Sequence, residues 1–125
     1  MIKSLKNRLE ILNFLKWIVE VPVVETTHAE IIGRYLTGYY EALVGVDDKD
    51  IPVGLMIYYI NEKTHTLFIL LLHARGQAMN FLDEFISFCK TSGIKKVQGY
   101  SVHGLDVFKH IPNVKKLYSV YEKEI

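Results

Sequence analysis

The sequence predicts an α+β (α/β) fold, a mixed and mostly antiparallel sheet of about five strands flanked by helices. Three observations predict it: short apolar runs of strand length fill the middle of the chain, polar turns separate them, and apolar residues at helical spacing lie on either side. The 125 residues are half hydrophobic, so one domain can bury roughly two-thirds of its unfolded-chain surface. We expect a single domain over residues 1–125, helical over 1–38 and sheet-forming over 39–125.

Composition excludes several functional classes. Fifteen basic and fourteen acidic residues leave a formal charge of +1, which gives no case for a nucleic-acid binder. The longest purely apolar run, residues 67–72, is far below the roughly 20 residues of a membrane-spanning helix. Cys89 is the single cysteine and cannot form an internal disulfide. We therefore expect a cytoplasmic protein that binds neither nucleic acid nor membrane.

Two helices are predicted in the first third of the chain. Apolar residues repeat at helical spacing over residues 2 to about 19, and Pro22 ends that helix; no strand is predicted before it. Thr26 and Thr27 are candidate caps for a second helix that reaches about Thr37. The first helix is apolar over more than one face, so either two layers cover it or it meets a second copy of the chain. A homodimer is the expectation.

The rest of the chain alternates strands with turns and one long helix. Residues 39–46, 52–60 and 64–72 are predicted strands joined by the polar turns 47–50 and 61–63, which is typical of an antiparallel meander. A helix begins at Ala78 and ends at Ser92-Gly93, because glycine readily adopts the left-handed cap. The remaining expected elements are a strand at 94–101, a short helix near 105–110 and a last strand at 114–121.

The break between the third strand and the long helix is the sharpest candidate site. A helix N-terminus offers unpaired backbone N–H groups and a partial positive charge, which suit phosphate oxygens. Gly76 allows a ligand to approach the backbone, and Arg75 would add a charged contact. The alternative is an ordinary strand–helix loop that binds nothing.

The order of elements over residues 39–125 resembles the GNAT superfamily of N-acetyltransferases. The family's acetyl-CoA motif is Gln or Arg, two residues, Gly, one residue, then Gly or Ala. It falls here on His73-Ala74-Arg75-Gly76-Gln77-Ala78. The exit from the long helix, residues 91–97, and the closing stretches 107–111 and 118–123 also look like those of the family. The resemblance implies transfer of an acetyl group from acetyl-CoA to an unidentified amine, with no metal.

The same resemblance implies roles for individual residues. The backbone near Leu70 and Leu71 would pair with the pantetheine arm, and the N–H groups of residues 74–78 would hold the pyrophosphate. Ser101 stands where many members have an Asn that contacts the cofactor, and Phe108 where many have a Tyr that protonates the leaving thiolate. Because phenylalanine has no proton to give, these departures, His73 and the missing first strand favour the alternative of a GNAT-like domain that has lost catalysis and acts in binding, regulation or assembly.

Other candidate groups come from the residues alone. Glu62, His65 and His73 are candidate bases for removing a proton from the amine. The five histidines have no compact metal-ligand spacing, and the loop with Asp47, Asp48 and Asp50 lacks the glycine of a calcium loop.

Residues 20–62 hold eight acidic and two basic side chains, which suits a cationic acceptor or is simply a solvated acidic face. Within the pairs 39–40 and 58–59, one tyrosine is expected in the sheet packing and the other in an acceptor cleft or a dimer surface.

Overall fold

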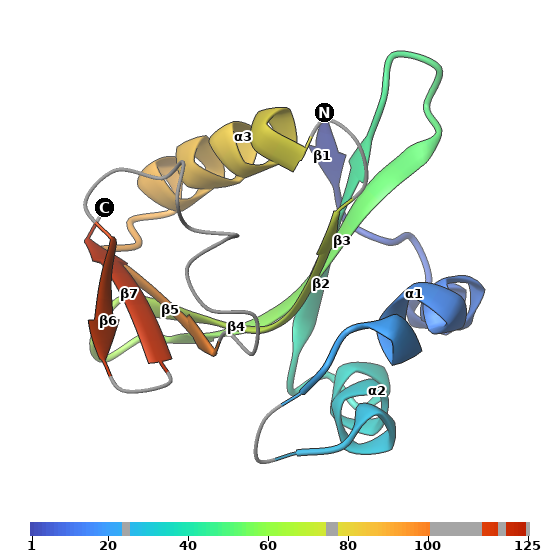
Figure 1. Cartoon of the computed structure of the whole chain (residues 1–125), viewed down its shortest axis with the longest axis horizontal. Coiled ribbons are helices and arrows are strands. Elements are labelled where there is room, and N and C mark those ends of the chain that lie inside the picture. The colour runs from blue at the N-terminus through green and yellow to red at the C-terminus, as the bar shows by residue number, and fades with distance from the viewer. Residues whose placement is uncertain (24–25, 75–77, 101–113, 118–119, 125) are drawn as a thin grey trace.

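A seven-stranded sheet runs through the described part of the chain, with α3 over one face and α1 and α2 over the other (Figure 1). The computed structural model describes residues 1–23, 26–74, 78–100, 114–117 and 120–124. In chain order the elements are β1 (Ile2–Lys3), the 3-10 helix η1 (Arg8–Phe14), α1 (Leu15–Glu20), α2 (His28–Leu36), β2 (Glu41–Val46), β3 (Pro52–Asn61), β4 (Thr66–Ala74), α3 (Ala78–Thr91), β5 (Lys96–Tyr100), β6 (Val114–Leu117) and β7 (Val120–Glu124).

The order of strands across the sheet is β1-β2-β3-β4-β5-β7-β6. Only β4 and β5 are parallel, and every other neighbouring pair is antiparallel. This confirms the predicted fold class, a mixed and mostly antiparallel sheet flanked by helices. The strand predicted at 114–121 is instead the two paired strands β6 and β7, and β1 is a further strand at the edge of the sheet.

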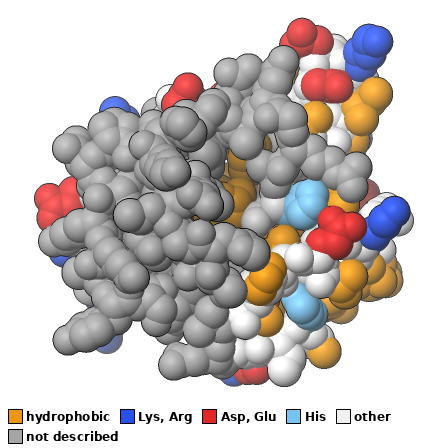
Figure 2. Space-filling model, in the orientation of Figure 1, with side chains coloured by type: hydrophobic (Ala, Val, Ile, Leu, Met, Phe, Trp, Pro, Cys, Tyr) orange, Lys and Arg blue, Asp and Glu red, His pale blue; other side chains and the backbone are white. Residues whose placement is uncertain are grey.

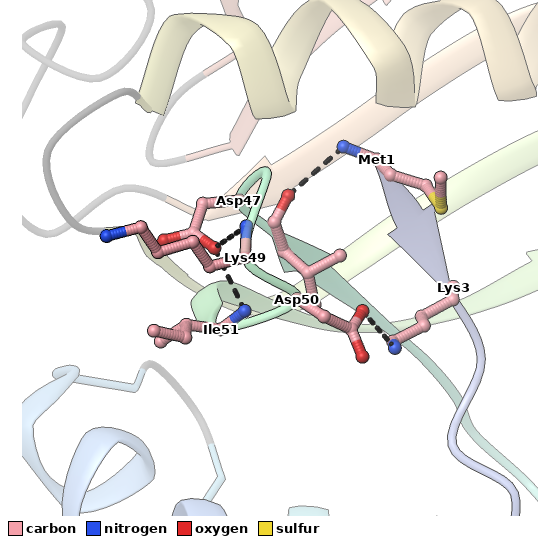
Figure 3. Close-up of polar contacts among 7 residues, drawn as sticks. Met1, Lys3, Asp47, Lys49, Asp50 and Ile51 are labelled. Carbon is pink, nitrogen blue, oxygen red and sulfur yellow. Dashed lines mark hydrogen bonds and ion pairs between the residues drawn. The ribbon is translucent and has the colours of Figure 1, made fainter.

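The prediction of one helix over residues 2–19 is wrong at its start. Residues 2 and 3 form β1, which pairs with β2, and helical structure begins only at Arg8. The amino group of Met1 donates to the carbonyl of Val46, and Lys3 forms an ion pair with Asp50 at 2.6 Å (Figure 3). Spacing alone could not separate a 3-10 helix from an α-helix, because side chains three apart share a face in both.

The turn between β2 and β3 is held by one carboxylate. Asp47 Oδ1 accepts hydrogen bonds from the backbone N–H groups of Lys49 and Ile51, each at 2.9 Å (Figure 3). Asp50 has a positive φ of 63°, a conformation that aspartate tolerates in turns. The acidic cluster at 47–50 is therefore a turn, as predicted.

Both longer helices begin or end where the sequence predicts. Thr27 caps α2, since its hydroxyl accepts a hydrogen bond from the N–H of Glu30. After α3 ends at Thr91, Gly93 has a φ of 76°, the left-handed conformation expected of a C-terminal glycine. The helix predicted near 105–110 lies outside the described residues.

Two apolar clusters hold the layers together, one on each face of the sheet. The first joins η1, α1 and α2 to β2, β3 and β4; its fully buried members include Ile11, Ile18, Ile31, Leu55 and Ile57. The second joins α3 to the other face and includes Met56, Leu67, Phe81, Phe85 and Cys89. Adjacent residues on β3 therefore enter opposite clusters, as the alternation of a strand requires.

Burial gives the protein a predictable loss of stability in alkali. Desolvation raises the pKa of the Tyr58 phenol to about 12, with a smaller contribution from the charge of Glu41, and raises the pKa of the Cys89 thiol to about 12. In the unfolded chain these groups lose their protons near 10.0 and 9.0, so stability is full below about pH 9 and falls as the pH rises towards 12.

We expect Tyr58→Phe to lose less free energy of unfolding in alkali than the wild type, because the phenylalanine ring keeps the packing without the titrating hydroxyl. Urea unfolding at about pH 8 and about pH 11 measures it, as the difference in free energy of unfolding between the two conditions. Equal losses in the variant and in the wild type would contradict the assignment.

Candidate functional site

Within the described residues, the pairing of β5 with β4 covers only the first half of β4. Their parallel register runs from Thr66 opposite Lys96 to Ile69 opposite Gly99, whereas β3 pairs with β4 as far as Ala74. No described residue of β5 pairs with residues 70–74. We call this segment the open edge of β4. Backbone N–H and C=O groups on such an edge need partners, so a thin ligand that lies along it can form strand-like hydrogen bonds.

A β-bulge lies where the open edge begins. Ile57 is opposite Leu71 and Tyr58 is opposite Ile69, so Leu70 is one extra residue in β4. As a result Leu70 and Leu71 both contact the cluster beneath α1 and α2, while Ile69 and Leu72 contact the cluster beneath α3. The bulge changes the direction of the strand next to the last described pair with β5.

Two facing glycines position the start of α3. Gly45 on β2 is directly opposite Gly54 on β3, and the ring of Phe81, in the first turn of α3, covers both. A Cβ at Gly45 would overlap the Phe81 ring, and one at Gly54 would lie 3.5 Å from it. Because neither glycine has a side chain, the first turn of α3 can lie close to the sheet, near the end of β4.

The structure places the predicted cofactor residues only in part. Leu70 and Leu71 lie at the bulge, Ala74 is the last residue of β4, and Ala78 is the first residue of α3. The open edge and the N-terminus of a 14-residue helix are therefore close along the chain, as the sequence predicts. The other predicted cofactor residues lie outside the described residues: Arg75, Gly76, Gln77, Ser101 and Phe108.

His73 faces α1 from the open edge of β4. Its ring stacks on Trp17 with centroids 4.8 Å apart, and its Nε2 lies 3.4 Å from Oε2 of Glu20. Nδ1 of His73 is buried and has no hydrogen-bond partner among the described residues. The imidazole is thus fixed in orientation by one ring and one carboxylate, and it retains one nitrogen for a ligand or a proton.

Glu62 and His65 lie at the opposite end of β4, in the turn that joins β3 to β4. His65 adopts a φ of 53°, and its carbonyl accepts a hydrogen bond from Lys95 N–H at 2.8 Å. Eight residues of strand separate His65 from His73, about 25 Å at the usual rise. The three candidate bases therefore do not meet at one site.

Aromatic rings form a row on the sheet face opposite α3. Tyr40 stacks on Tyr59 with centroids 5.8 Å apart, and Tyr59 stacks on Phe68 at 5.5 Å. Phe68 immediately precedes Ile69, the last described residue of β4 that pairs with β5. Tyr58 instead contacts Phe88 of α3, so the two tyrosines of this pair lie on opposite faces, as the sequence predicts.

Two hollows flank this row and share Tyr59. The larger, of about 610 Å³, is called here the tyrosine hollow; it is lined chiefly by Arg34, Tyr39, Tyr40, Glu41, Tyr59 and Glu62. The smaller, of about 340 Å³, is called the strand hollow; its lining includes Asn61, Thr64, Thr66, Phe68, Lys96 and Gln98. Together they extend from the end of α2 to Phe68 and Gln98, one residue before the last described pair of β4 and β5.

Most charges around the tyrosine hollow are already paired. Arg34 forms an ion pair with Glu30 at 3.1 Å, and Arg8 forms one with Glu41 at 3.0 Å. Arg8 also donates to the carbonyls of Tyr35 and Tyr40, which joins η1 to the segment between α2 and β2. For Glu62 the structure records no ion pair within its described part.

Neither a metal cluster nor a spanning helix is found within the described ranges. No three His, Cys, Asp or Glu side chains gather there in a way that could hold an ion. None of the helices described is long and apolar enough to cross a membrane. Cys89 belongs to the buried cluster beneath α3, as predicted for a core thiol.

Known structures match this architecture over nearly its whole length. A GNAT-family acetyltransferase from Staphylococcus aureus covers 99% of this chain and 98% of its own, at 12% identity and a TM-score of 0.65. A spermidine N-acetyltransferase variant from Vibrio cholerae covers 99% of this chain and 94% of its own, at 10% identity and a TM-score of 0.73. This chain has the GNAT fold.

A third solved structure of this fold contains bound coenzyme A. The PaiA N-acetyltransferase from Thermoplasma acidophilum, in complex with coenzyme A, covers 100% of this chain and 98% of its own, at 16% identity and a TM-score of 0.68. No family profile matches the sequence, and no curated protein is detectably similar to it. The GNAT fold was predicted from the order of elements, and the solved structures confirm it.

Sequence reasoning missed four residues that shape the site. Gly45 and Gly54 receive Phe81, and Trp17 and Glu20 hold His73. An isolated glycine inside a strand does signal close approach of another group, so the first pair had a signal in the sequence. Nothing in the sequence links Trp17 or Glu20 to His73, which is more than 50 residues away.

Proposed function

We propose that this chain binds acetyl-CoA and transfers its acetyl group to an amine. The observation that carries the proposal is the open edge of β4, residues 70–74, which no described residue of β5 pairs with and which leads along the chain to α3. The open edge of β4 suits the amide-bearing pantetheine arm, and the N-terminus of α3 suits the pyrophosphate. Acetyl-CoA would supply an activated thioester, so that nitrogen bonds to the carbonyl carbon, the carbon–sulfur bond breaks, and the thiol of coenzyme A leaves.

Thermal unfolding with and without acetyl-CoA tests cofactor binding. A cofactor concentration a hundredfold above the dissociation constant should stabilise the fold by about 2.7 kcal/mol. We expect Gly76→Glu to abolish this shift, because the new carboxylate would repel the pyrophosphate. Gly33→Glu is the matched control: Gly33 is exposed on α2, and a Cβ added there would have nothing within 4 Å. If Gly76→Glu folds and still responds, the phosphate site is misplaced.

Among the three candidate bases we propose His73, assisted by Glu20. His73 is three residues from the bulge at Leu70, whereas His65 is five and Glu62 eight. The neighbouring carboxylate would stabilise the imidazolium that forms when the ring takes the proton from the attacking amine. Three residues of strand span about 10 Å, so a chain of hydrogen-bonded waters would carry the proton across this gap.

We expect His73→Gln to lower kcat by on the order of a hundredfold, the lower bound for a general base. The binding of acetyl-CoA should be retained, because glutamine is one of the two residues that the family's motif has at this position. His65→Gln is the control and should retain activity. A reversed outcome, in which His65→Gln is inactive and His73→Gln is not, would place the base at the other end of β4.

The second candidate function is a GNAT-like domain that binds without catalysis. Phe108 stands where the resemblance implies a tyrosine that protonates the thiolate, and phenylalanine has no proton to give. Ser101 stands where it implies a cofactor-binding asparagine, and serine has no side-chain amide. A thermal shift with acetyl-CoA, but no release of the coenzyme A thiol across a panel of amines, would favour this function over transfer.

A homodimer and a cytoplasmic location also remain proposals. Hydrophobic side chains reach the surface over η1 and α1 (Figure 2), and Leu9 and Val19 are 62% and 58% exposed. We propose that this stripe meets a second copy of the chain, because an apolar surface in contact with water favours association. Light scattering after size-exclusion chromatography measures the mass directly.

A further inference from the structure

We propose that the acceptor is a small, extended diamine, and that the tyrosine hollow holds the ammonium group that does not react. This inference rests on the proposed acetyl transfer, because it takes the reacting amine to lie at the start of the open edge of β4. The other end of the acceptor would then lie along the row of rings formed by Phe68, Tyr59 and Tyr40.

The charge around the tyrosine hollow favours a cation. Arg34 and Glu41 both line it, but each is paired with a residue that does not, Glu30 and Arg8 respectively. Of the two carboxylates that line the hollow, Glu41 is paired and Glu62 forms no ion pair among the described residues. An incoming ammonium group would therefore meet a net negative site.

The lining groups match an alkylammonium chain in chemistry as well as charge. The phenol oxygens of tyrosine and the carboxylate oxygens of Glu62 accept hydrogen bonds from an ammonium group. The rings of Tyr59 and Phe68 give the methylene chain an apolar surface. Tyr39 is 74% exposed at the rim, where burial by a ligand would add apolar contact area.

The geometry sets the length of the acceptor. Thr66 pairs with Asn61, next to Glu62, and Ile69 is the last described residue that pairs with β5. Three residues of β4 separate these points, or about 10 Å. The two hollows, of about 610 and 340 Å³, share Tyr59 and are in the size range of small-molecule sites. This favours a short diamine over a monoamine.

Calorimetric titration with hexamethylenediamine tests the hollow without acetyl-CoA, so that no transfer can occur. We expect the wild type to bind the diamine and not hexanediol, its neutral counterpart. Glu62→Gln should weaken the diamine about tenfold through loss of a charged hydrogen-bond partner. Asp48→Asn is the matched control: it removes the same charge from an exposed position in the β2–β3 turn and should change nothing.

The outcomes separate this inference from the proposed function. Diamine binding that depends on Glu62, without acetylated product when acetyl-CoA is added, would support the hollow and overturn the transfer. Transfer to monoamines as efficient as to diamines, unchanged in Glu62→Gln, would overturn the hollow and leave the transfer standing. Equal weakening by Glu62→Gln and Asp48→Asn would also overturn it, because only the overall charge would then matter.

Discussion

Replacing Gly45 with alanine is expected to destabilise the fold by about 1–3 kcal/mol, the usual cost of overpacking a core. Glycine to alanine in an extended strand would otherwise stabilise, because the unfolded chain loses freedom. Here the new methyl group would overlap the ring of Phe81, which is itself 4% exposed and cannot move outward freely. Since Phe81 lies in the first turn of α3, the change should also disturb the proposed phosphate site.

Urea unfolding of Gly45→Ala measures the cost, with Gly33→Ala as the control. Gly33 lies within α2 without a close neighbour, so alanine there should stabilise by about 0.5–1 kcal/mol through helix propensity. Combining Gly45→Ala with Phe81→Leu should cost less than the sum of the two single changes, because the smaller side chain relieves the overlap. Additive costs would mean that the ring of Phe81 does not depend on Gly45.

Replacing Gly99 with valine is expected to weaken acetyl-CoA binding by on the order of tenfold or more, the effect of misplaced aliphatic bulk in a binding site. Gly99 is opposite Ile69 in the last described pair between β4 and β5. A Cβ there would lie 3.4 Å from Cβ of Ile69, which is ordinary contact, so the strand should still form. The rest of the valine side chain would project beside Ile69 on the α3 face of the sheet, next to the start of the open edge of β4.

The acetyl-CoA-induced thermal shift measures this effect, and side-chain size provides the control. Gly99→Ala should reduce the shift less than Gly99→Val, whereas unfolding without ligand should be similar in all three proteins. A full shift in Gly99→Val would place the thioester away from the start of the open edge of β4, and would remove the main support for the proposed function.

The sequence predicted the strands of the meander and α3 because their signals are local. Short continuous apolar runs bounded by polar turns mark β2 and β3, and the left-handed preference of Gly93 marks the end of α3. The strand β1 could not be found in this way, because two residues are too few to show a period. Its position depends on pairing with Val44 and Gly45, more than 40 residues away.

The candidate site likewise has parts that could be predicted from local signals in the sequence and parts that could not. The strand–loop–helix join after Leu72 could be predicted, since a change from strand to helix pattern with a glycine between them is visible in the chain. The bulge at Leu70 could not, because a bulge exists only relative to the register of β3. The same holds for Trp17 and Glu20 around His73, and for the ring row from Tyr40 to Phe68.

The sequence by itself determined the strands of the meander, α2, α3 and β5, their order along the chain, and hence the fold class. Only the tertiary structure decided how the described part of β5 pairs with β4, and that Gly45 and Gly54 lie opposite each other beneath Phe81. The physical reason is the range of the interactions. Periodicity, capping and turn preferences act between residues a few positions apart, whereas register and packing join residues that the chain separates by tens of positions.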